Sequence, residues 1–225
     1  AIGPRTRAIV LISPNNPTGA IYPPSVIRAF FDVARRARVA LVIDETYKDF
    51  LPEDGRPHEL FADPDWSGTL VHLYSFSKMF ALTGYRVGSL TASAAFVTQA
   101  HKVMDCVAIC APRLGQEAAL YGLGHLGGWV RENTLAMRRR ALEFRQALQR
   151  LNGLRLVSLG AYFAYLEHPG GGQSDVDVAK RLALGENLLM LPGSTFGPGQ
   201  ERYIRLAFAN APEDAVPAIL ERLGR

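Results

Sequence analysis

Residues 8–19 read AIVLISPNNPTG, a short apolar run over Ala8–Ile12 followed by a loop of prolines, asparagines and a glycine. A run of this length predicts a strand that is buried on both faces of a parallel sheet. A helix is expected over Pro24–Ala37, because proline suits a first helical turn and apolar residues recur on one side. A second buried strand is expected over Val39–Ile43. This alternation of strand and helix predicts an α/β domain.

The rest of the chain continues this alternation and then changes character. Further strands are expected over Leu70–Leu73 and Val87–Ala92, and one long helix over Gly127–Gln149. Shorter elements follow: strands over Arg155–Val157, Tyr162–Leu166, Leu188–Leu191 and Tyr203–Phe208, a helix over Val176–Leu184 and a last helix from Pro212. We therefore expect residues 1–112 to belong to a large α/β domain, and residues 113–225 to form a bridging helix with a smaller α+β domain.

Composition and charge exclude several classes of function. With 48% hydrophobic and 20% charged residues, the chain has the composition of an ordinary globular protein. It lacks the apolar run of about 18 residues that a membrane span needs. The net charge of +4 is modest, and the densest basic cluster, Arg138–Arg140, lies in a helical pattern. That cluster indicates a solvated helix face and not a nucleic-acid surface.

The cysteines and histidines do not predict a metal site. The five histidines lack a ligand spacing such as HExxH, so no metal is expected. Cys106 and Cys110 form neither a CxxC pair nor half of a zinc site. We interpret them as two buried thiols in a reducing cytoplasm.

Polar residues recur directly after the predicted strands. Asp44 ends the second strand, Tyr47 follows three residues later, and the third strand is followed by the motif SFSK (75–78) with Arg86 eight residues beyond its lysine. Open α/β sheets bind ligands at the carboxyl ends of their strands, so these residues are expected to form a site. Arg205 stands in an apolar strand, where a guanidinium without a partner would be costly.

The ordered set of motifs resembles the fold-type I, class I and II aminotransferases of the aspartate aminotransferase superfamily. The motifs are SPNNPTG (13–19), DETY (44–47), SFSK (75–78), GYRVG (84–88), LPGSTFG (191–197) and YIRLAF (203–208). The resemblance implies the fold of pyridoxal-5′-phosphate (PLP) dependent transferases, with a three-layer α/β/α large domain, truncated at its N-terminal side, and a smaller α+β C-terminal domain. It also implies a cytoplasmic homodimer that transfers amino groups between amino-acid and 2-oxo-acid substrates.

The resemblance further implies catalytic roles for three residues. Lys78 is implied to bind PLP as a Schiff base and, once released, to shuttle a proton at the substrate Cα. Asp44 is implied to keep the pyridine nitrogen of PLP protonated. Asn16 and Tyr47 are implied to donate hydrogen bonds to the 3′-oxygen of PLP.

The remaining implied roles concern binding. Ser75, Ser77 and Arg86 are implied to hold the phosphate of PLP, with Arg86 as a fork-shaped donor. Arg205, together with Asn16, is implied to bind the α-carboxylate of the substrate and so to orient its Cα–H bond.

The chain opens on Ala1, where the N-terminal portion of the family would already have ended. We therefore expect a C-terminal part of a larger protein. By itself it is expected to be inactive, with an unpaired edge on its large-domain sheet.

Two alternatives to an aminotransferase stay open. C–S lyases, aminocyclopropane-carboxylate-synthase-like enzymes and decarboxylases share the counterparts of Lys78, Asp44 and Arg205, and family frequency favours the aminotransferase. The second alternative is a non-enzymatic, aminotransferase-like ligand-sensing domain of a transcription regulator. A basic helix-turn-helix upstream of the fold would indicate such a sensor.

Overall fold

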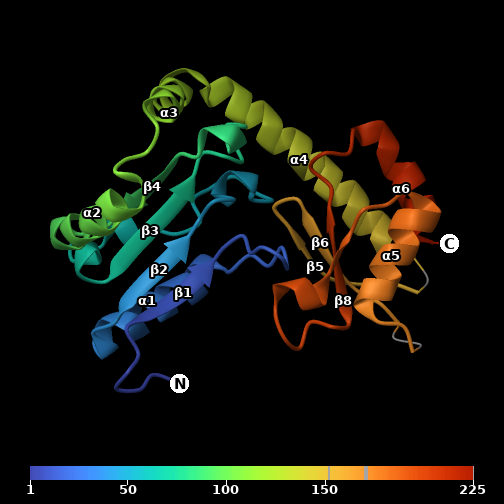
Figure 1. The fold of residues 1–225 in the computed structure, drawn as a ribbon, viewed down its shortest axis with the longest axis horizontal. Coiled ribbons are helices and arrows are strands. Elements are labelled where there is room, and N and C mark those ends of the chain that lie inside the picture. Colours follow the sequence, from blue (N-terminus) through green and yellow to red (C-terminus); the bar gives the residue numbers. More distant parts are fainter. Residues whose placement is uncertain (152, 170–171, 225) are drawn as a thin grey trace. The chain divides into compact units, whose positions relative to one another are not determined.

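The structure is a computed structural model that describes residues 1–151, 153–169 and 172–224 (Figure 1). The chain forms two compact units: unit 1 comprises Ala1–Pro14 and Tyr22–Asn133, and unit 2 comprises Asn15–Ile21 and Thr134–Arg225. The short segment Asn15–Ile21 thus belongs with the later part of the chain. The assignment of domains on either side of residue 112 stays a prediction.

Unit 1 is built on a four-stranded sheet with the order β1-β2-β3-β4. The first three strands are parallel and β4 is antiparallel to β3. Its elements are β1 (Ala8–Ile12), α1 (Pro24–Ala37), β2 (Ala40–Asp44), η1 (Lys48–Phe50), η2 (Leu60–Ala62), η3 (Trp66–Gly68), β3 (Leu70–Ser75), η4 (Thr83–Tyr85), β4 (Gly88–Thr91), α2 (Ala94–Ala108) and α3 (Arg113–His125). The prediction of an α/β unit is confirmed.

Helix α1 buries one face against the sheet. Ile27, Phe31 and Ala34 are fully buried at helical spacing and pack against Leu41 and Ile43 of β2. Burying a side chain as large as Phe31 stabilises the folded state by about 1.5–3 kcal/mol before entropy is subtracted. The packing of α1 on the sheet therefore fixes β2, the strand that ends in Asp44.

Unit 2 contains a second, antiparallel sheet with the order β5-β6-β8-β7. Its core is shared between the strands and one side of three helices, with Phe144, Leu182 and Leu223 contributed by α4, α5 and α6. The elements are α4 (Gly127–Leu148, which begins in unit 1), β5 (Arg155–Gly160), β6 (Phe163–Glu167), α5 (Asp175–Glu186), β7 (Leu191–Pro192), η5 (Gly193–Phe196), β8 (Tyr203–Ala207), η6 (Glu213–Ala215) and α6 (Val216–Leu223). The predicted smaller α+β unit is present.

The strand predicted over Leu188–Leu191 is wrong for most of its length. The observed strand β7 begins only at Leu191, although Leu188 and Met190 are buried and Leu189 is exposed. The Leu188 N–H donates to the carbonyl oxygen of Leu182 at 3.0 Å, after Asn187 has adopted the left-handed conformation. Leu188 therefore belongs to the turn that ends α5. The alternation of buried and exposed residues over Leu188–Met190 comes from this turn and not from a strand.

The expectation that both cysteines are buried is wrong, and the solvated face expected for Arg138–Arg140 is wrong for Arg140. Cys106 in α2 and Cys110 just beyond it are exposed, and none of the residues of α2 is buried. Arg140 is not simply solvated: its Nη1 donates to the carbonyl oxygen of Ala209 at 2.8 Å in a half-buried position. Among the described residues, no helix has the length and apolar character that a membrane crossing requires.

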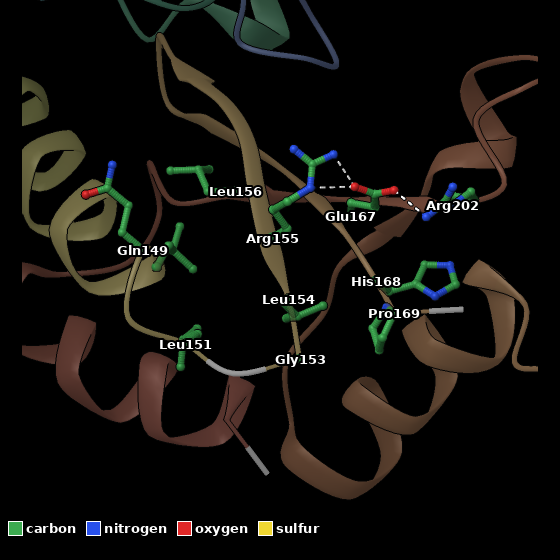
Figure 2. Close-up of a pocket in the computed structure, with 11 residues that line it drawn as sticks. Gln149, Leu151, Gly153, Leu154, Arg155, Leu156, Glu167, His168, Pro169 and Arg202 are labelled. Atoms are coloured by element: carbon green, nitrogen blue, oxygen red, sulfur yellow. Dashed lines mark hydrogen bonds and ion pairs between the residues drawn. The ribbon is translucent and has the colours of Figure 1, made fainter. Parts of the chain in front are cut away.

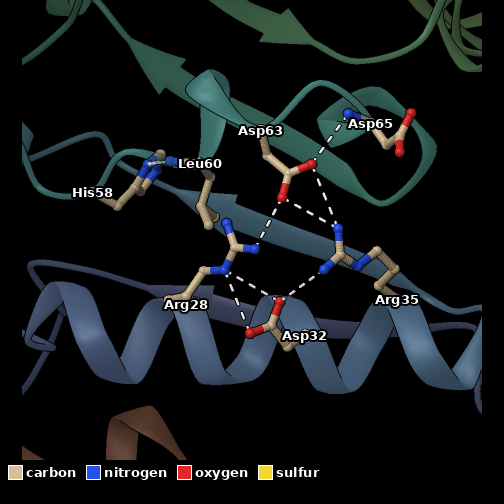
Figure 3. Close-up of polar contacts among 7 residues, drawn as sticks. All are labelled: Arg28, Asp32, Arg35, His58, Leu60, Asp63 and Asp65. Carbon is tan, nitrogen blue, oxygen red and sulfur yellow. Dashed lines mark hydrogen bonds and ion pairs between the residues drawn. The ribbon is translucent and has the colours of Figure 1, made fainter.

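An ion-pair network joins α1 to the loop between η2 and η3 (Figure 3). Asp63 Oδ2 lies 2.9 Å from Arg28 Nη2 and 3.2 Å from Arg35 Nη1. Asp32, on the helix, forms ion pairs with the same two guanidinium groups. The Asp63 side chain is 9% exposed. A hydrogen bond from the Asp65 backbone N–H, together with Arg28 and Arg35, lowers the pKa of the Asp63 carboxyl.

Asp63→Asn is expected to lower the free energy of unfolding at pH 7, because two guanidinium groups lose a shared carboxylate. Since the pKa of Asp63 is lowered in the folded state, its contribution is present above the unfolded value of about 3.9 and is lost as the pH falls through the folded value. Urea unfolding of both proteins should therefore show a smaller difference near pH 3 than at pH 7. Asp65→Asn, at an exposed neighbour, is the control. A difference in unfolding free energy between wild type and Asp63→Asn that is independent of pH would contradict the lowered pKa of Asp63.

Candidate active site

The candidate active site is built on the parallel pairing of β2 with β3. The register places Asp44 beside Leu73, so these two residues share a face of the sheet. Ser75 follows Leu73 by two positions and therefore lies on the same face. The pairing brings the Asp44 carboxylate and the Ser75 hydroxyl to the carboxyl ends of neighbouring strands, where open α/β sheets bind ligands.

A cavity of about 900 Å³ lies at this edge of the sheet. Asp44, Thr46, Ser75 and Arg86 are among its polar lining residues. Asp44 Oδ1 accepts a hydrogen bond from the Thr46 backbone N–H at 3.0 Å, so the turn after β2 orients the carboxylate. The apolar lining comes from β3, β4, α2 and the segment after α2: Leu73, Leu90, Met104, Val107, Ala108, Ala111 and Pro112. The cavity thus combines a carboxylate, a hydroxyl and a guanidinium with an apolar wall.

The loop that carries Lys78 is held by a chain of hydrogen bonds. Arg86 Nη1 donates to the Thr83 carbonyl oxygen at 3.1 Å, and the Thr83 hydroxyl donates to the Ser77 carbonyl oxygen at 3.0 Å. The Ser77 backbone N–H donates in turn to Ser75 Oγ at 3.3 Å. These bonds connect the three predicted phosphate-binding residues through the backbone on either side of Lys78.

Three predicted site residues of unit 1 do not line this cavity, namely Tyr47, Ser77 and Lys78. Tyr47 and Ser77 are buried, whereas Lys78 is half-buried in the loop that follows β3. The structure therefore brings Asp44 and Ser75 to one cavity with Arg86. The roles of all six residues stay predictions.

Asn16 and Arg205 lie together in unit 2, although 189 positions separate them. Arg205 Nη1 donates to Asn16 Oδ1 at 2.6 Å. The guanidinium carbon lies 4.8 Å from the centroid of the Phe163 ring and 4.9 Å from that of the Phe196 ring, within the range of cation–π attraction. Sequence reasoning missed these two rings as neighbours of Arg205, because an aromatic residue in a strand or turn carries the same signal as ordinary packing.

The segment Asn15–Ile21, which carries Asn16, packs closely on the hairpin of β5 and β6. Gly19 has a φ of +70°, and a Cβ added to it would lie 2.6 Å from the backbone nitrogen of Gly160. A Cβ on Gly160 would collide with the carbonyl oxygen of Gly19. The Ser158 hydroxyl donates to the Thr18 carbonyl oxygen beside this crossing. Glycine is required at both positions because the two backbones touch.

A second cavity, of about 550 Å³, lies in unit 2 at the C-terminal end of α4 (Figure 2). Glu167 binds two arginines there: its Oε2 lies 2.7 Å from Arg155 Nε, and its Oε1 lies 2.6 Å from Arg202 Nη2. None of the predicted site residues lines this cavity. Its carboxylate already has both guanidinium groups as partners, so the candidate active site remains the cavity at β2 and β3.

The sequence matches one protein family over nearly its whole length. Residues 1–223 match the family described as aminotransferase class I and II. The chain therefore belongs to the class I and II aminotransferases, as the resemblance of its motifs predicts.

Curated relatives carry the same kind of name. The chain is 28% identical to an aromatic aminotransferase of Arabidopsis thaliana over 225 residues, which cover 98% of the chain and 55% of that protein. It is 27% identical to an aspartate aminotransferase of Sulfolobus acidocaldarius, with coverage of 91% and 52%. The chain thus spans about half the length of the relatives it matches.

Solved structures agree with the observed fold. An aspartate aminotransferase of Thermus thermophilus, a tetra mutant, superposes with a TM-score of 0.85 at 29% identity and covers 100% of this chain and 61% of its own. An aromatic aminotransferase of Pyrococcus horikoshii gives a TM-score of 0.86 at 26% identity, with coverage of 100% and 60%. The predicted fold class, the PLP-dependent transferase fold, is confirmed.

Members of this family depend on PLP, and the residues of the cavity fit that cofactor. PLP offers an anionic phosphate, which matches the Arg86 guanidinium and the Ser75 hydroxyl, since a hydroxyl that accepts one bond can still donate another. Its ring nitrogen matches the Asp44 carboxylate. Its aldehyde suits a primary amine such as that of Lys78, which lies in the loop after Ser75 and outside the cavity lining. The apolar wall suits the ring itself.

Gly160→Ala is expected to destabilise unit 2 by about 1–3 kcal/mol or more, because the new Cβ must displace the backbone of the Asn16 segment. Gly185→Ala is the matched control: Gly185 lies exposed in α5 with no atom within 4 Å of an added Cβ. That change should be neutral or stabilising by up to about 1 kcal/mol. Thermal unfolding checks both, and equal melting temperatures for the two variants would contradict the close crossing.

Proposed function

We propose that the protein containing this chain is a PLP-dependent aminotransferase that moves an amino group between an L-amino acid and a 2-oxo acid. The cavity that Asp44, Ser75 and Arg86 line together, with Lys78 between Ser75 and Arg86 in the chain, is the observation that supports this most directly. Relatives named aspartate and aromatic aminotransferases support an α-amino acid as the donor. The homodimer and the cytoplasmic location that the resemblance implies are part of this proposal.

Bound PLP supplies an electron sink for the bonds at the substrate Cα. Asp44 accepts a hydrogen bond from the ring nitrogen and keeps the proton on that atom, because an ionised carboxylate favours a neighbouring cation. Lys78 supplies the amine that binds the cofactor covalently, and its Nζ, once released, carries the proton to and from the substrate Cα.

The phosphate and the 3′-oxygen of PLP need hydrogen-bond donors. Ser75, Ser77 and Arg86 are proposed to hold the phosphate, and the hydrogen bonds that already connect them keep their loop in one arrangement. Tyr47 is proposed to donate its hydroxyl proton to the 3′-oxygen, together with the Asn16 amide.

Arg205 is proposed to bind the α-carboxylate of the amino acid with both nitrogens of its fork, as guanidinium groups bind carboxylates. Asn16 and the rings of Phe163 and Phe196 hold the guanidinium in place before the substrate arrives. A guanidinium that is already oriented loses less conformational entropy on binding, and this orients the Cα–H bond for proton transfer.

Reduction of the PLP-loaded complete protein with borohydride is expected to attach the cofactor to Lys78, which mass spectrometry of the peptides can locate. Lys78→Ala should abolish both this adduct and transamination, because no other amine is proposed for the site. Lys102→Ala, at an exposed lysine of α2, is the control and should retain both. An adduct on any other lysine would overturn the central assignment.

Arg205→Lys is expected to lower kcat/KM, with a loss of transition-state stabilisation on the order of a few kcal/mol, because lysine keeps the charge but loses the two-pronged geometry. The absorption spectrum of bound PLP should change little, since the residues proposed to hold PLP, apart from Asn16, lie in unit 1. Arg202→Lys, at an exposed arginine just outside β8, is the matched control and should leave kcat/KM unchanged. An Arg205→Lys protein with a lower melting temperature and an unaltered KM would refute the proposed role.

A further inference from the structure

Two carboxylates lie immediately beside the proposed catalytic residues of unit 1 but point elsewhere. Glu45 directly follows Asp44, and Asp49 follows Tyr47 by two positions. Neither carboxylate belongs to the cavity lining. Both instead contact side chains of β3, the strand that leads to Ser75.

Glu45 is 2% exposed and lies between two histidines. Its Oε2 is 2.9 Å from His72 Nε2, and its Oε1 is 3.3 Å from His58 Nε2. The His58 Nδ1 accepts the backbone N–H of Leu60 at 3.1 Å, so the ring proton of a neutral His58 lies on Nε2. His58 Nε2 and Glu45 Oε1 are close but make no hydrogen bond among the described residues. Burial lowers the pKa of His58, which favours this neutral form.

Asp49 makes the second connection to β3. The Tyr74 hydroxyl donates to Asp49 Oδ2 at 2.5 Å, and Lys48 Nζ lies 2.9 Å from Asp49 Oδ1 and 4.9 Å from the centroid of the Tyr74 ring. Burial, followed by the charge and hydrogen bond of Asp49, raises the pKa of Tyr74, so its hydroxyl keeps the proton that it donates. The segment after β2 is thus tied to β3 at both of its ends.

The two ties share one face of β3. His72 and Tyr74 are two positions apart and point to the same side, whereas Leu73 and Ser75 point to the side of Asp44. The Glu45 backbone N–H also donates to the Leu73 carbonyl oxygen at 2.9 Å, which continues the ladder by one residue. Leu73, Tyr74 and Ser75 all line the cavity, but only the other face of β3 anchors the neighbouring segment, through His72 and the Tyr74 hydroxyl.

We propose that Glu45 and Asp49 are positioning residues that, through His72 and Tyr74, fix Asp44 and Tyr47 relative to Ser75. This inference rests on the proposed function, because it assigns a purpose to the geometry of that site. Stability alone explains the Glu45 anchor poorly: a buried carboxylate is costly to desolvate, and apolar residues of similar volume often stabilise a protein as well or better. Fixed geometry is a different gain, since small displacements of catalytic groups cost large factors in rate.

The first test uses the Tyr74–Asp49 pair in the complete protein. Tyr74→Phe keeps the ring and removes only the anchoring hydroxyl, and Asp49→Ala removes its acceptor. Each variant is expected to raise the dissociation constant for PLP and to lower kcat by about tenfold or more, while the KM for the amino acid changes by less than about twofold. The double variant should be no worse than Asp49→Ala alone, because Asp49→Ala already removes the Tyr74–Asp49 bond together with the Lys48–Asp49 pair.

The second test uses His72, where a conservative variant can restore the contact. His72→Leu removes the donor to Glu45 and is expected to weaken PLP binding and alter the visible circular dichroism of bound PLP, which reports how the ring is held. His72→Gln retains an N–H donor and should recover much of the wild-type signal.

For the Tyr74→Phe variant, Tyr165→Phe is the matched control for loss of a tyrosine hydroxyl bond. It removes the 2.8 Å bond to Gln200 in unit 2 and should leave PLP affinity unchanged.

The outcomes separate this inference from the proposed function. If wild-type protein binds PLP on Lys78, and the anchor variants lose melting temperature but keep PLP affinity, circular dichroism and kcat, the anchors are structural and the inference is overturned. Additive effects of Tyr74→Phe and Asp49→Ala would also overturn it, since the residues would then act independently. If wild-type protein does not bind PLP on Lys78, the proposed function itself fails and the inference falls with it.

Discussion

The parallel register between β2 and β3 is the constraint on which unit 1 depends. Because Asp44 pairs with Leu73, the side chains at the ends of these strands divide into two sets on opposite faces of the sheet. One set reaches the cavity and includes Asp44 and Ser75, and the other includes Glu45 and His72 in a buried polar cluster. A slip of one residue would exchange the two sets and turn Asp44 away from the cavity. The packing of α1 on β2 opposes such a slip, because the slip would turn the apolar side chains of β2 away from α1 and expose them.

Unit 2 depends on a different constraint, the contact of two backbones at Gly19 and Gly160. This crossing attaches the Asn15–Ile21 segment to the β5–β6 hairpin, so that Asn16 belongs to the same compact unit as Arg205. The proposed carboxylate-binding group is therefore complete within one unit. The groups proposed for the ring nitrogen and for the phosphate lie within the other unit.

The charged groups of unit 1 fall into two kinds with different consequences. The pairs formed by Arg28 and Arg35 with Asp63 join the helix to a loop at the surface, where solvent and salt weaken ion pairs. The Glu45 carboxylate is buried between imidazoles, where water cannot reduce the cost of its charge. The hydrogen bond between Glu45 and His72 holds the two residues in one geometry, because a misplacement would leave buried polar groups without that bond.

The sequence by itself determined the family, the α/β architecture and the identity of most elements, because apolar runs, helix starts and ordered motifs are local signals. It also singled out Asp44 and Ser75, since residues at the carboxyl ends of parallel strands converge, and Arg86 through its place eight residues after Lys78. Only the tertiary structure decided which residues contact one another and which are exposed. It placed two aromatic rings beside Arg205, exposed Cys106 to solvent, and put Leu188 in the turn that ends α5. Contacts between distant positions depend on strand register and helix packing, and a single sequence read locally contains neither.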